Sequence, residues 1–183
     1  GITIRGENGT IGQQLNIAGT QVLVNNGLIS ADVGGGTIAV RESNVVNNST
    51  MEARNGATLD LFSQVDNSAG EILAADNSVV GLNAMRVIGG DLTSTGTGNI
   101  LVTSSGSNFL EGVNVSGQLD MESIANSRLR VTDDMTLDGT VNINGNGILS
   151  FEGDNLLDGS GTVVFGDTGP GNRFDLDGTG TTT

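Results

Sequence analysis

Residues 57–77, ATLDLFSQVDNSAGEILAADN, contain three short motifs, each made of two residues at spacing i, i+2. Successive side chains of an extended chain point to opposite faces, so residues at i and i+2 share one face of a short strand. Asn, Ser, Gly and Asp separate the motifs, which predicts three strands arranged as a triangular coil. The motifs are Leu59/Leu61, Val65 with Asn67, and Ile72/Ala74.

The three motifs recur in the same order along the chain. The first is matched by Leu15/Ile17, Ile38/Val40, Val80/Leu82 and Ile100/Val102. The second is matched by Val22/Val24, Val45/Asn47 and Met85/Val87. The third is matched by Ile29/Ala31, Met51/Ala53 and Leu92/Ser94. A repeat of roughly 20 to 22 residues is typical of a solenoid.

The pattern continues after a polar insert, TSSGSN, at residues 103–108. The later pairs are Val113/Val115, Leu119/Met121, Leu129/Val131, Met135/Leu137, Val141/Ile143, Leu149/Phe151, Leu156 or Leu157, and Val163/Phe165. This series indicates about seven turns of three strands each, with fragments at both ends.

This period predicts an all-β fold, a single-stranded right-handed parallel β-helix that forms one domain over residues 1–183. A helical face would need apolar residues at i, i+3, i+4 and i+7, which the motifs do not provide. An antiparallel sandwich also has short strands and turn signals, but the regular three-strand period disfavours it. Stacking coils about 4.8 Å apart would join their apolar pairs into one core.

Asn47 and Asn67 occupy the same position in adjacent coils. They could point inward and stack as an amide ladder, or they could be outward corner residues, and the sequence leaves both alternatives open.

The composition narrows the function classes. The chain has 7 basic residues, all Arg, against 21 acidic ones, a net charge of −14. Such a surface repels phosphate backbones, so we expect no nucleic-acid partner. No apolar stretch is long enough for a membrane span, so we expect no membrane insertion.

Candidate chemistry is sparse, and we expect no enzyme. The chain lacks His, Lys, Cys, Trp and Tyr, which removes most nucleophiles and general bases. Carboxylates gather near Arg128 and Arg130, and we interpret them as a solvated acidic edge rather than a catalytic pair. They are Asp133, Asp134, Asp138, Glu152, Asp154 and Asp158.

Calcium is the one candidate cofactor. The Gly-rich segment GDTGPGNRFDLDGTG, residues 166–180, contains Asp167, Asp175 and Asp177. Calcium prefers such oxygen ligands, but the later ligand positions of an EF-hand loop are missing.

Four segments carry a resemblance: GITIRGENGTIG (1–12), NNGLISADVGGGTIAV (25–40), LEGVNVSGQLDM (110–121) and LRVTDDMTLDGTVNINGNG (129–147). They resemble repeat units of very large secreted bacterial β-solenoid proteins, broadly filamentous-haemagglutinin-type adhesins and autotransporter passenger domains. The resemblance covers most of the chain. It implies an extracellular or cell-surface structural role in bacteria, with no catalytic residues to carry over.

The ends of the chain lead to the functional hypothesis. Neither end has an amphipathic segment that would cap the coil. We therefore expect copies to join end to end, covalently in a tandem array or by stacking, as a fibre, stalk or sheath. The expected junction residues are Ile2, Ile4, Ile11, Phe174 and Leu176. The alternative is an adhesin module that binds carbohydrate or matrix protein through a lateral face or through the insert at Ser104 to Leu110.

Overall fold

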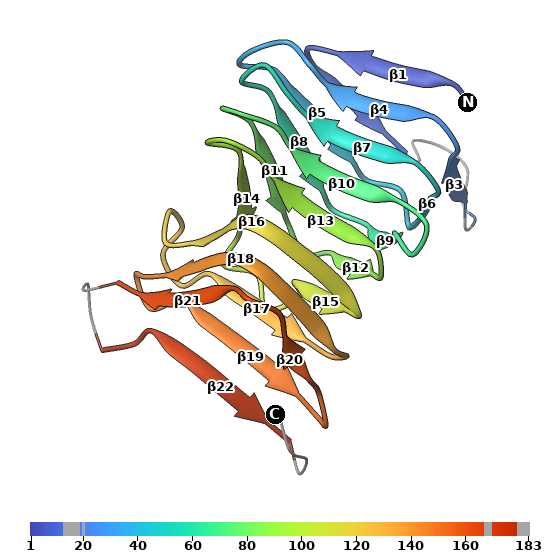
Figure 1. The fold of residues 1–183 in the computed structure, drawn as a ribbon. Coiled ribbons are helices and arrows are strands. Elements are labelled where there is room, and N and C mark those ends of the chain that lie inside the picture. The colour runs from blue at the N-terminus through green and yellow to red at the C-terminus, as the bar shows by residue number, and fades with distance from the viewer. Residues whose placement is uncertain (13–18, 20, 167–169, 179–183) are drawn as a thin grey trace.

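The computed structural model describes residues 1–12, 19, 21–166 and 170–178. This part of the chain contains no helix. Its parallel strands stack as a right-handed β-solenoid of about 8 turns with about 22 residues per coil (Figure 1). The predicted fold class is therefore confirmed.

Each coil has three faces. The first face contains β1 (Thr3–Gly6), β4 (Leu28–Ala31), β7 (Thr50–Ala53), β10 (Glu71–Ala74), β13 (Asp91–Ser94) and β20 (Leu157–Asp158). The second contains β2 (Gly9–Ile11), β5 (Thr37–Val40), β8 (Thr58–Leu61), β11 (Val79–Leu82), β14 (Asn99–Val102) and β21 (Thr162–Phe165). Two long strands, β16 (Val113–Met121) and β18 (Met135–Ile143), run along both faces and join them into one 14-stranded sheet.

The third face is a separate 8-stranded sheet. It contains β3 (Val22–Asn25), β6 (Asn44–Asn47), β9 (Gln64–Asp66), β12 (Arg86–Ile88), β15 (Phe109–Glu111), β17 (Arg128–Val131), β19 (Ile148–Glu152) and β22 (Arg173–Asp177). The N-terminal coil lies at one end of the stack and the C-terminal coil at the other (Figure 1).

The core consists of columns of aliphatic side chains, one residue per coil. On the second face, Leu59 pairs with Ile38 on one side and with Val80 on the other, and Val80 pairs with Ile100. All four side chains are 4% exposed or less. Burying each such side chain stabilises the fold by about 1.5 to 3 kcal/mol. The register confirms the predicted first and third motifs with one correction: Gly9 and Ile11, rather than Leu15 and Ile17, pair with Ile38 and Val40. Leu15 and Ile17 lie outside the described residues.

In the first coil, the inward pair of the second motif lies one residue later than the sequence predicts. The structure pairs Leu23 with Val45 and Asn25 with Asn47, whereas Val22 and Val24 point outward and are 56% and 50% exposed. The sequence VLVN has apolar residues at three consecutive positions, so its alternation does not reveal which ones face inward. Only the pairing with β6 decides it.

Two further predictions on this face are corrected. Val87 pairs with Val65, so the matching pair does not begin at Met85. The supposed insert ends in a regular strand, β15, in which Leu110 pairs with Val87 and Val131 and is fully buried. The turn before β15, residues 103–108, is longer than the corresponding turns of the three preceding coils, which contain two or three residues.

Asparagines form an inward ladder at one corner, which settles the alternative left open by the sequence. Asn25 Nδ2 donates to Asn47 Oδ1, and Asn47 Nδ2 donates to Asn67 Oδ1, both over 2.7 Å. Each amide also donates to a backbone carbonyl of the following coil: Thr50 O, Glu71 O or Asp91 O. The ladder ends at Asn67, because the next coil has Gly89 and Gly90 at this corner and neither carries a side chain.

Candidate functional site

Exposed apolar side chains gather at the two ends of the solenoid. Eight of the nine large hydrophobic residues that are exposed in the described part lie on the first or last coil, and Val33 is the exception. The eight are Ile2, Ile4, Val22, Val24, Leu156, Val164, Phe165 and Leu176. Apart from Val33, the coils between the first and the last expose no such side chain among the described residues, so the ends are the candidate functional site.

The N-terminal end is an open, apolar hollow. Ile4, Ile11 and Leu23 continue the inward columns of the three faces through their pairing with Ile29, Val40 and Val45. A hollow of about 290 Å³ lies at this end, lined in part by Ile2, Ile4, Leu23, Val24 and Ile29. The columns therefore reach the surface without a covering layer among the described residues.

The C-terminal end exposes the same columns. Phe174 stacks on Phe151 with a centroid distance of 5.2 Å. Leu176 pairs with Phe151 and is 59% exposed, and Phe165 pairs with Ile143 and is 53% exposed. These side chains are supported by the preceding coil on one side only.

All five predicted junction residues lie on these two coils. Ile2, Ile4 and Ile11 belong to the first coil, and Phe174 and Leu176 to the last. Sequence reasoning missed Leu23 because of the one-residue shift on β3. It also placed Val163/Phe165 in the last turn without recognising that Phe165 would lie at the open end.

Two of the three predicted calcium ligands lie in the described part, and both are on β22. Asp167 lies outside this part. Asp175 makes an ion pair with Arg173 over 3.5 Å, and Asp177 follows it two positions later on the same strand. The described part contains no group of three or more His, Cys, Asp or Glu that could hold a metal ion. Calcium therefore stays a prediction.

Several carboxylates of the predicted acidic edge hold turns between coils. Asp134 Oδ1 accepts a hydrogen bond from Leu156 N, and Asp138 Oδ1 accepts bonds from the backbone N and Oγ of Ser160. The bonds from Ser160 lower the pKa of Asp138. Glu152 pairs with Arg130. These contacts give the acidic residues a structural role.

Arginines and one phenylalanine form a stack on the outer side of the third face. The guanidinium groups of Arg86 and Arg130 lie 4.6 Å and 4.4 Å from the centroid of the Phe109 ring. Arg86 pairs with Glu111 and Arg130 with Glu152, and the hydrogen bond from Arg130 to Glu152 raises the pKa of Arg130. Phe109 sits in the register between the two arginines, so its ring is not a free platform for a sugar.

The turn before β15 is fastened to this stack. Arg130 Nη1 donates to Gly106 O over 3.5 Å. Asn108 is buried, and its Nδ2 donates to the carbonyls of Thr103 and Arg128, both over 3.1 Å. The segment from Ser104 to Leu110, the expected adhesive insert, is thus held to the solenoid at Gly106 and at Asn108.

In the part of the chain that the structure describes, no helix is long and apolar enough to span a membrane. Comparison of the chain with family models, curated proteins and solved structures found no match.

Proposed function

We propose that this chain is a structural module of the bacterial cell surface that extends a fibre, stalk or sheath by joining end to end with copies of itself. The observation that carries the proposal is the exposure of the inward apolar columns at both ends of the solenoid. An open coil edge offers unpaired strands and uncovered apolar side chains, and a further coil would cover both.

The strand order supports a specific register at the junction. Within the chain, each strand stacks on the strand of the same face in the neighbouring coil. If the last coil of one copy stacks on the first coil of the next, β20 meets β1, β21 meets β2, and β22 meets β3. All these pairings are parallel, as they are inside the chain.

The columns then match on all three faces. Phe165 ends the second-face column that begins at Ile11, and Leu176 ends the third-face column that begins at Leu23. On the first face, the column that begins at Ile4 includes Leu137, and Met135 lies two residues before Leu137. Leu157 pairs with Met135, so it would meet Ile2, which lies two residues before Ile4. Each face would contribute one apolar pair to the junction.

The charge of the chain fits a module that joins at its ends rather than along its flanks. A net charge of −14 makes neighbouring rods repel each other until cations screen the charge. The resemblance to secreted β-solenoid proteins supports placing such rods outside the cell.

Sedimentation velocity over a wide concentration range, with electron microscopy of the same samples, tests this proposal. We expect species of increasing length and constant width as the concentration rises. Single rods of one length at every concentration would count against end-to-end joining. Growth in width would point to lateral association instead.

A further inference from the structure

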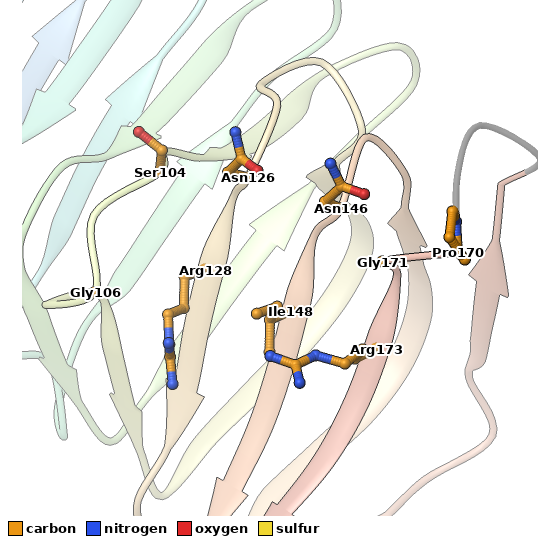
Figure 2. Close-up of a pocket in the computed structure, with 9 residues that line it drawn as sticks. All are labelled: Ser104, Gly106, Asn126, Arg128, Asn146, Ile148, Pro170, Gly171 and Arg173. Atoms are coloured by element: carbon orange, nitrogen blue, oxygen red, sulfur yellow. The ribbon is translucent and has the colours of Figure 1, made fainter.

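A shallow groove of about 620 Å³ lies on the third face, beside the turns that precede its strands (Figure 2). Its lining comes from the last four coils and includes Ser104, Asn126, Arg128, Asn146, Ile148 and Arg173. The volume lies in the range of roughly 300 to 1,000 Å³ that small-molecule sites occupy.

The groove differs in charge from the rest of the chain. Its lining contains two arginines and no acidic residue, although the chain has 21 acidic residues against 7 arginines. It is therefore a basic spot on an acidic protein, which favours an anionic group at this place.

The two arginines are less engaged than their neighbours on the same sheet. Arg128 Nε is buried without a hydrogen-bond partner, and Arg128 makes no ion pair with any described residue. Arg173 lies 3.5 Å from Asp175, beyond the roughly 2.7 to 2.9 Å of a good charge-assisted hydrogen bond. The terminal guanidinium nitrogens of Arg128 have no hydrogen-bond partner among the described residues, so they can donate to a ligand oxygen in the groove.

The geometry places both guanidinium groups on one side of the groove. Arg128 and Arg173 share a register position with Ile148 between them, and Arg173 extends across Ile148 toward Arg128 (Figure 2). Ser104, Asn126 and Asn146 line the opposite side in a row (Figure 2). A planar guanidinium matches a carboxylate, and the hydroxyl and amide groups can donate to and accept from sugar hydroxyls.

We propose that this groove binds a saccharide that carries a single carboxylate, with the carboxylate between Arg128 and Arg173 and the hydroxyls toward Ser104, Asn126 and Asn146. A single charge is specified because the net charge of −14 repels a polyanionic chain. The site lies on the flank of the solenoid and does not depend on end-to-end joining.

An amide NMR titration tests this site with methyl β-D-glucuronide, and with methyl β-D-glucoside as its uncharged counterpart. We expect saturable shifts confined to residues 104–106, 126–128, 146–148 and 171–173. Binding of the glucoside should be weaker by about tenfold or more, since about 1.4 kcal/mol corresponds to one decade. Arg128→Gln and Arg173→Gln should each weaken glucuronide binding by about fivefold or more.

The matched control is Arg41→Gln, which makes the same change of charge far from the groove. Arg41 is an exposed residue of the second coil, and its guanidinium stacks on the Phe62 ring. This variant should leave the affinity unchanged. The proposal is overturned if no saturable shift occurs up to about 50 mM, if the glucoside binds equally well, or if Arg41→Gln weakens binding as much as the groove variants. Acetate binding as tightly as the glucuronide would overturn the saccharide assignment.

Discussion

Asn47 and Asn67 lie directly above one another in consecutive coils, and the amide of Asn47 donates to Asn67 Oδ1 over 2.7 Å. Both side chains are fully buried. Asn25 and Asn47 each donate to the next amide, and all three amides donate to a carbonyl of the following coil, so the ladder joins successive coils at one corner. Buried amides that are all satisfied fix the register of the coils as well as stabilising them.

Replacing the middle rung of this ladder should destabilise the solenoid. Asn47→Ala leaves Asn67 Oδ1 and Glu71 O without the donor that they have now. We expect a loss of about 2 to 3 kcal/mol in the free energy of unfolding, because unsatisfied buried polar groups each cost about 1 to 3 kcal/mol. Denaturant unfolding measures it. Asn48→Ala, which removes only an exposed bond to Asn26, should change stability by less than about 0.5 kcal/mol.

Replacing an apolar residue at the open C-terminal end should prevent association without unfolding the monomer. Leu176→Asp puts a charge at the end of the third-face column, where Leu176 is already 59% exposed. We expect sedimentation to show single units at concentrations at which the unchanged chain associates. Val33→Asp is the control, since Val33 is also 42% exposed but lies on neither the first nor the last coil. Equal association of both variants would contradict the proposed junction.

Removing the ring between the two arginines should loosen the turn before β15. Phe109→Ala loses the contacts with Arg86 and Arg130, each worth about 0.5 to 1 kcal/mol at a partly exposed site. We expect faster amide hydrogen exchange over residues 104–111. Phe62→Ala removes a ring that contacts Arg41 in another coil, and it should leave exchange in this segment unchanged.

The pKa values of Asp120 and Asp60 are shifted in opposite directions, so the two aspartates should contribute to the pH dependence of stability with opposite sign. Burial alone would raise the pKa of Asp120, but hydrogen bonds from Ser123, Asn99 and Glu122 N outweigh it and lower the pKa. The folded state therefore favours the charged form. Its stabilisation is present above the unfolded pKa of about 3.9 and is lost as pH falls through the lower folded pKa.

Unfolding free energies measured between neutral and acidic pH check this sign. Asp120→Asn should be less stable than the unchanged chain at neutral pH, and the gap should close as pH falls below about 4. At Asp60, burial raises the pKa despite a hydrogen bond from Asn83 and the charge of Arg41. Asp60→Asn should therefore be neutral or stabilising at neutral pH. If the difference in unfolding free energy between Asp120→Asn and the unchanged chain widened in acid, the lowered pKa of Asp120 would be contradicted.

Much of the architecture follows from the amino-acid sequence by itself. Pairs such as Leu59/Leu61 and Ile72/Ala74 alternate cleanly with polar residues and recur at nearly constant spacing, so the period, the three-strand coil and most of the core could be predicted. The exposed apolar ends could also be predicted in part, because residues at the edges of a repeat have a neighbour on one side only.

Only the tertiary structure decided which residues face inward where the alternation fails. In VLVN (22–25), three consecutive residues are apolar, and the inward positions of Leu23 and Asn25 are fixed by hydrogen bonds to β6. The arginine groove has no sequence signature, because Arg128 and Arg173 are 45 residues apart (173 − 128) and share a register position only once the coils stack. A sequence specifies periodicity locally, whereas the direction of a side chain and its neighbours across coils depend on strand pairing.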